Sequence, residues 1–288
     1  MYVFSVLTSC VAFLTTLVLA RRVVGGQLRQ TTLTTAGVWA LLMSVVWSTA
    51  WLLEFVLATL SDGAADLLWY SAAIIGLCPP IAVLGAKRPG VRVWNVFILL
   101  PLAAVFGWAA LADGPAAIRD GGFQIEMPVT IGFFIVSVMG IGNYIGTRWT
   151  FPALGYCFAC WTILTRATLI GEREYFPNLQ MFGFWLMIGC LLAVCRFSRV
   201  SPIKDKGFDR VWLEFRDWFG IVWSKRIQER VNDTASKEDW CARLEHHGFE
   251  WSPDATEEQR AETNERIDHT LRWLLRRFVN DEWIDERL

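Results

Sequence analysis

The sequence predicts an all-α fold: a polytopic membrane helix bundle of about seven spans, followed by a small α-helical module in the cytosol. Of the 288 residues, 54% are hydrophobic and only 19% are charged, whereas soluble domains carry about 25% charged residues. The long apolar runs end near residue 195, and 17 of the 27 Lys and Arg and 20 of the 28 Asp and Glu lie beyond that point. These observations divide the chain into a membrane domain, 1–198, and a cytosolic helical tail, 199–288.

Each predicted span is an apolar run long enough to cross the bilayer, which takes roughly 20 residues. The fifth run is interrupted by Asn143, and the seventh run is short. The predicted spans cover residues 1–20, 33–60, 67–86, 93–111, 128–145, 151–170 and 179–195.

The charges in the connections predict the orientation, because Lys and Arg in short loops stay on the cytosolic side. One set of alternate connections is purely basic and contains Arg21, Arg22, Arg29, Lys87, Arg88, Arg92 and Arg148. The other set contains Asp62, Asp66, Asp113, Asp120, Glu126, Glu172 and Glu174, with Arg119 and Arg173 as its basic residues. We therefore expect a multi-pass protein of the inner or plasma membrane, with its N-terminus outside and its C-terminus in the cytosol.

One outer connection, 112–127, is longer than the others and rich in glycine and proline. It is long enough to fold over the outer end of the bundle. The sequence leaves open whether it forms a lid or a slack connector.

Two charges, Glu54 and Arg166, stand within predicted spans. A charge at the bilayer centre costs about 2.5–3.5 kcal/mol on insertion scales, so charges in spans usually pair or line a cavity. Glu54 lies six residues before the end of its span and Arg166 four, which places them about 9 and 6 Å from the outer face. We expect an ion pair between them. The alternatives are that both side chains snorkel to the outer interface or that they form a substrate or proton site.

Proline and glycine predict special features in three spans. Pro79 and Pro80 in the third span and Pro101 in the fourth remove backbone donors, and each site is expected to kink its helix. Gly142 and Gly146 are four residues apart, a spacing that lets two helices pack closely. Asn143, beside them, can hydrogen-bond to another helix. Packing within the bundle and packing in a dimer both remain open for this face.

The cysteines and histidines predict no cofactor and no metal. Cys157 and Cys160 form a C-x-x-C pair, but they lie within an apolar run and no outer loop holds a second pair for thiol exchange. No predicted span contains histidine, which excludes a bis-histidine haem there. In the tail, His246 and His247 are adjacent and point to different faces of a helix, which disfavours a zinc site with His269.

The tail is predicted to be helical. Apolar residues recur at helical spacing over 208–231, a short helix is expected over 237–246, and a second long helix begins near Thr256. Thr256 and Gln259 have the spacing of a capping box. Basic and acidic residues alternate along the tail without a basic stripe, so nucleic-acid binding is disfavoured.

Three functions remain open from the sequence. The first is a non-enzymatic sensor-like, accessory or scaffold protein that contacts the lipid bilayer and docks a cytosolic or membrane protein partner through residues 208–280. The second is a small-molecule transporter or permease, and the third is a membrane enzyme acting on lipid or quinone. Seven spans with an outer N-terminus resemble, in topology alone, the input halves of some bacterial sensor proteins.

Overall fold

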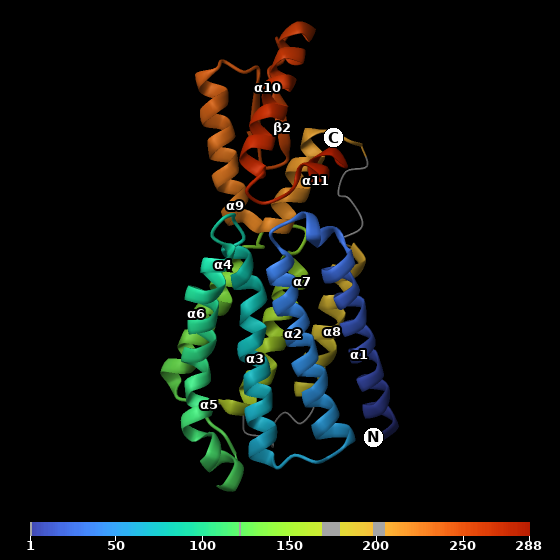
Figure 1. Cartoon of the computed structure of the whole chain (residues 1–288), viewed down its shortest axis with the longest axis vertical. Coiled ribbons are helices and arrows are strands. Elements are labelled where there is room, and N and C mark those ends of the chain that lie inside the picture. Colours follow the sequence, from blue (N-terminus) through green and yellow to red (C-terminus); the bar gives the residue numbers. More distant parts are fainter. Residues whose placement is uncertain (1, 121, 169–178, 198–204) are drawn as a thin grey trace.

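The computed structural model describes residues 2–120, 122–168, 179–197 and 205–288. Within these residues, seven helical segments run side by side as a bundle, and the tail packs on one end of it (Figure 1). We call this end of the bundle the tail end and the opposite end the far end. The N-terminus lies at the far end (Figure 1). The seven segments are α1 (Tyr2–Gly25), α2 (Thr34–Trp51), α3 (Asp62–Leu84), α4 (Val91–Trp94) continuing into α5 (Leu100–Asp120), α6 (Met127–Gly142), α7 (Thr150–Leu164) and α8 (Leu179–Phe197).

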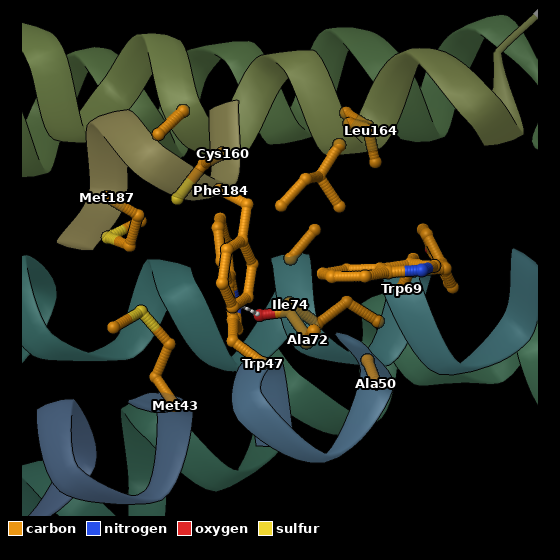
Figure 2. Close-up of a cluster of buried hydrophobic side chains, with 14 of the residues drawn as sticks. Met43, Trp47, Ala50, Trp69, Ala72, Ile74, Cys160, Leu164, Phe184 and Met187 are labelled. Atoms are coloured by element: carbon orange, nitrogen blue, oxygen red, sulfur yellow. Dashed lines mark hydrogen bonds between the residues drawn. The ribbon is translucent and has the colours of Figure 1, made fainter. Parts of the chain in front are cut away.

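Helix α3 is the centre of the bundle and contacts α2, α5, α6 and α7. Small residues on α3, including Ala72 and Gly76, allow these neighbours to approach. Aromatic side chains fill the space beside α3, and Figure 2 shows Trp47 and Phe184 meeting there. The Trp47 indole donates a hydrogen bond to the carbonyl of Ala72 at 3.0 Å, so this buried polar group is satisfied within the apolar core.

Five of the described helical segments are long and apolar enough to cross a membrane. The outward faces of α1, α2, α5 and α8 are apolar as well; on α5, for example, Val105 and Leu111 are 72% and 73% exposed. The prediction of a predominantly helical chain is confirmed. The five segments are Tyr2–Gln30, Thr34–Val56, Asp62–Leu84, Val91–Arg119 and Leu179–Phe197.

The long connection predicted over 112–127 is mostly helix, because α5 continues through Gly114 and Pro115 to Asp120. The remaining segment is pinned to the bundle. The backbone N–H of Ile125 donates to the carbonyl of Ala167 at 2.7 Å, and Phe123 and Ile125 are both buried. Of the two alternatives that the sequence left open, a slack connector does not describe this segment, which is an extension of α5 followed by residues held against the bundle.

The tail contains α9 (Phe208–Lys237), β1 (Ala242–Glu245), β2 (Gly248–Trp251), α10 (Glu257–Leu275) and α11 (Asp281–Asp285). The helix predicted over 237–246 is wrong, since β1 and β2 form an antiparallel hairpin there. Alternate residues of β1 are buried, as in a strand with one face on a core. Gly248, at φ +138°, follows the two-residue loop formed by His246 and His247. The capping box at Thr256 and Gln259 is confirmed.

The tail and the bundle share one hydrophobic core. Phe215 and Phe219 of α9 stack with ring centroids 4.7 Å apart, and Phe278 meets both edge-on. The same cluster includes Leu33 and Val83 from the tail end of the bundle. The division at residue 198 therefore separates two parts of the sequence that pack as a continuous structure.

Candidate functional site

A buried polar cluster lies near the far end of the bundle and is centred on Arg166, which follows α7. Its guanidinium binds Glu54 Oε1 at 2.7 Å and Asp66 Oδ1 at 2.9 Å. It also donates to Gln180 Oε1 at 2.8 Å, and Trp69 Nε1 donates to Glu54. Relative exposure of the side chains is 12% for Arg166, 19% for Glu54 and 2% for Asp66. The structure thus brings together the two predicted residues and adds three polar partners.

Asp66 was assigned to an outer connection by its sequence position, and its place in this cluster was missed. Helix α3 begins five residues before the predicted start of the third span, at Asp62. The Ser61 side chain accepts a hydrogen bond from the Ala64 N–H and so caps this earlier start. A serine before Asp62 is the signal that could have placed Asp66 on a helix.

The cluster joins four helical segments, and the segment that follows α5 covers it. Glu54 lies in a π-helical turn, Leu52–Val56, that continues α2. The backbone N–H of Phe123 donates to Asp66 Oδ2 at 3.3 Å, which holds the segment after α5 against the cluster. Because each charged group meets a partner within the protein, this arrangement can clamp α2, α3, α7 and α8 together.

The three predicted proline positions are all helical. Pro79 and Pro80 lie inside α3, which continues without interruption to Leu84. Pro101 is the second residue of α5 and follows the π-helical turn Asn95–Leu99. Both helices continue through these prolines. The predicted kinks stay predictions.

The helix face predicted to carry both Gly142 and Gly146 is not continuous in the structure, and packing of these glycines in a dimer stays a prediction. Helix α6 ends at Gly142, and Gly146 lies in the following turn at φ +83°. Adjacent backbone apart, no atom of the described residues lies within 4 Å of a Cβ placed on either glycine. The glycine of α6 that does allow close approach is Gly140, whose Cβ position is 2.9 Å from Pro80.

Asn143 hydrogen-bonds to the tail, not to a neighbouring helix of the bundle. Helix α9 breaks at Gly220, which has φ +78° and ψ 180°. Around this break, Asn143 Nδ2 donates to the carbonyl of Phe219 at 3.0 Å, and its Oδ1 accepts from the Val222 N–H at 3.0 Å. The Asn143 carbonyl also accepts from the Ile221 N–H at 2.8 Å. One asparagine therefore satisfies the backbone groups that the break in α9 leaves without helical partners.

A second group of charges joins the bundle and the tail near this break. Asp217 of α9 is buried and forms ion pairs with Arg148 at 3.1 Å and Arg216 at 3.2 Å. Burial lowers the pKa of the Arg148 guanidinium from its ordinary value, and the neighbouring Asp217 carboxylate opposes that shift. Arg216 also donates to the carbonyl of His246 at 2.8 Å, so the hairpin is tied to the same site.

An apolar cavity of about 260 Å³ lies between the bundle and the tail. Ala40 of α2, Pro80 of α3 and Ile141 of α6 form part of its wall, and Asp217 and Trp218 of α9 form another part. Its volume is close to the lower limit of ligand pockets, about 300–1,000 Å³. A cavity of this size and character can hold a small apolar molecule.

The remaining candidate ligands for metal or redox chemistry are scattered. Cys157 and Cys160 are both free thiols on α7. Within the ranges that the structure describes, no three His, Cys, Asp or Glu side chains gather to hold a metal ion. Glu172, Arg173 and Glu174, which the sequence predicts in an outer connection, lie outside the described residues, as do Arg199 and Lys204.

No family model, curated protein or solved structure matches this chain.

Proposed function

We propose that this chain is a sensor-like membrane protein with seven spans, an outer N-terminus and a cytosolic tail. In this proposal a small apolar molecule enters the cavity, and its binding alters the tail, which docks a cytosolic or membrane protein partner. The observation that carries the proposal is the composition of the cavity wall, to which the bundle contributes Ala40 and Ile141 and the tail contributes Trp218.

The contacts around the cavity support transmission between its occupant and the tail. The Trp223 indole of α9 donates to the carbonyl of Val83 at the end of α3, at 3.1 Å. Asn143, two residues beyond Ile141, holds both sides of the break in α9. A molecule that displaces Trp218 or Ile141 therefore acts on contacts that position α9.

The surface of α10 supports partner docking by the tail. The buried residues of this 19-residue helix are Thr263, Ile267, Leu271 and Leu275, which form one stripe facing the tail core. The opposite face is exposed and charged, and the N-terminal end of α10 projects away from the bundle (Figure 1). A charged face of this kind suits a transient contact with a soluble protein domain.

The transporter alternative receives less support. Transport requires a polar path with groups that can bind and release a solute. The Glu54 and Arg166 side chains instead contact each other, and Phe123 and Ile125 are buried in the segment that covers the cluster. The sensor role instead requires only the apolar cavity between the bundle and the tail.

Filling the cavity should alter the tail. We expect Ala40→Phe to change amide hydrogen exchange in α9, because the added ring occupies space bounded by Trp218. Deuterium uptake of the full chain in lipid nanodiscs, measured by mass spectrometry, checks this. The matched control is Val38→Phe on the same helix, since Val38 is 51% exposed. Equal α9 uptake in both folded variants would contradict coupling through the cavity.

The proposed orientation has its own test. A fluorescent protein fused after Leu288 should fluoresce, because such reporters fold in the cytosol, while alkaline phosphatase fused there should be inactive. Phosphatase fused after Gly122, at the far end, should be active, and phosphatase fused after Gly90, at the tail end, inactive. The reverse pattern would show that the tail lies outside.

A further inference from the structure

A basic groove lies between the connection that follows α3 and the helix α9. Lys87, Arg88 and Arg226 line it, together with Trp94 and Trp223, and no acidic residue is among its lining residues. Its volume is about 560 Å³, which lies within the range of small-molecule sites, about 300–1,000 Å³. The groove therefore combines a ligand-sized space with charges of a single sign.

Within the described part of the chain, the three cations are held by aromatic rings and an amide and not by carboxylates. Lys87 Nζ and Arg226 Cζ lie 5.7 and 5.0 Å from the ring centroid of Trp223. Arg88 donates to the amide oxygen of Asn280 at 2.6 Å. Among the described residues, none of the three forms an ion pair with a carboxylate. The aromatic rings and the amide orient these cations while leaving their charge available to an anion.

Exposed apolar residues line part of the groove, which therefore lies at the edge of the apolar surface of the bundle. Met139 of α6 and Val222 of α9 both line the groove, and they are 57% and 37% exposed. The Trp94 indole donates to the carbonyl of Ile81 at 3.1 Å, so its ring is held at the end of α3. Tryptophan at the end of an apolar helix is typical of the membrane–water interface. An occupant could therefore reach the cations with a charged head and the exposed Met139 side chain with an apolar chain.

We propose that this groove binds the head group of an anionic phospholipid of the cytosolic leaflet. Guanidinium and ammonium groups bind phosphate oxygens through charge-assisted hydrogen bonds, and basic pockets beside spanning helices on the cytosolic side are suited to anionic head groups. The acyl chains extend from the groove along Met139 on α6. The assignment to the cytosolic leaflet rests on the proposed orientation, whereas the preference for an anionic lipid does not.

Lipid binding by the delipidated full chain in neutral detergent tests this proposal. Native mass spectrometry should show phosphatidylglycerol binding more tightly than phosphatidylcholine. Lys87→Gln combined with Arg226→Gln should weaken phosphatidylglycerol binding roughly 10–30-fold, because each basic residue near the head group contributes. The charge-preserving pair Lys87→Arg and Arg226→Lys should retain most of the affinity. Thermal unfolding of each variant verifies that the chain is folded.

The matched control removes the same charge elsewhere on the same side. Arg29 and Lys206 lie outside the groove, so Arg29→Gln with Lys206→Gln should leave the lipid preference unchanged. An equal loss in this control would overturn the groove as the site and indicate general surface attraction. Inorganic phosphate that displaces phosphatidylglycerol at equal concentration would overturn the lipid assignment in favour of a free anion. Since the assay uses detergent, its outcome is independent of the cavity and orientation tests.

Discussion

Arg166→Met should lower the free energy of unfolding of the bundle by about 3–5 kcal/mol, the usual cost of removing one partner from a buried ion pair. The substitution preserves much of the side-chain volume but leaves the buried Asp66 and the largely buried Glu54 without their shared cation. Unfolding by denaturing detergent in mixed micelles measures the change. The loss of packing is small by comparison, so the expected effect is mainly electrostatic.

The control for this variant is Arg119→Met, because Arg119 is an exposed arginine near the same end of the bundle. We expect it to cost less than about 1 kcal/mol, as exposed pairs do. A cost this small for Arg166→Met would instead favour a side chain that snorkels to the interface. Glu54→Gln and Arg166→Gln, measured singly and together, isolate the coupling of the pair. Strictly additive losses would show that the two residues do not interact.

Gly220→Ala should detach α9 from the end of α6. The backbone at φ +78° and ψ 180° is open almost exclusively to glycine, and other residues pay of order 1–3 kcal/mol there. A Cβ at this position would also lie 2.2 Å from Asn143 Nδ2 and 2.4 Å from the Asn143 carbonyl oxygen. The tail should therefore become sensitive to limited proteolysis near residue 220, while α1–α8 remain folded.

Gly107→Ala is the matched control, because Gly107 lies within α5 and, its own helix backbone apart, no atom in the described part of the chain lies within 4 Å of its Cβ position. That substitution should be neutral or slightly stabilising, as alanine is favoured over glycine in helices. Asn143→Ala combined with Gly220→Ala should cost less than the sum of the two, since both act on one junction. Unchanged proteolysis of Gly220→Ala would show that the break in α9 is not needed for docking.

The sequence could predict the parts of the structure that depend on local apolar patterns. The helical runs were visible because each is long and continuous, and Glu54 and Arg166 were visible because they are the charged residues inside such runs. Asp66 could not be separated from the acidic connections without the earlier start of α3, which depends on the cap at Ser61. The charge pattern assigns a residue to one end of the bundle, but the position of the helix cap determines whether that residue lies in a connection or on a helix.

The parts that were missed depend on contacts between distant segments. The sequence around Asn143 does not reveal its role, because its hydrogen-bond partner is the distant backbone of α9 beside Gly220. The hairpin of β1 and β2 was predicted as a helix because its strands have only four residues each, too few for a clear alternation. Likewise, Lys87 and Arg226 are ordinary charges in their own segments, and the groove they share exists only after the tail packs on the bundle.

The core shared by the tail and the bundle has a consequence for biogenesis. Leu33 and Val83 are synthesised early, whereas Phe215, Phe219 and Phe278 leave the ribosome near the end of translation. These three aromatic side chains can be buried completely only after the ends of α2 and α3 have come together. Maturation of the tail is thus ordered after assembly of the bundle, and a chain whose early helices fail to assemble would display an aromatic surface to the quality-control machinery.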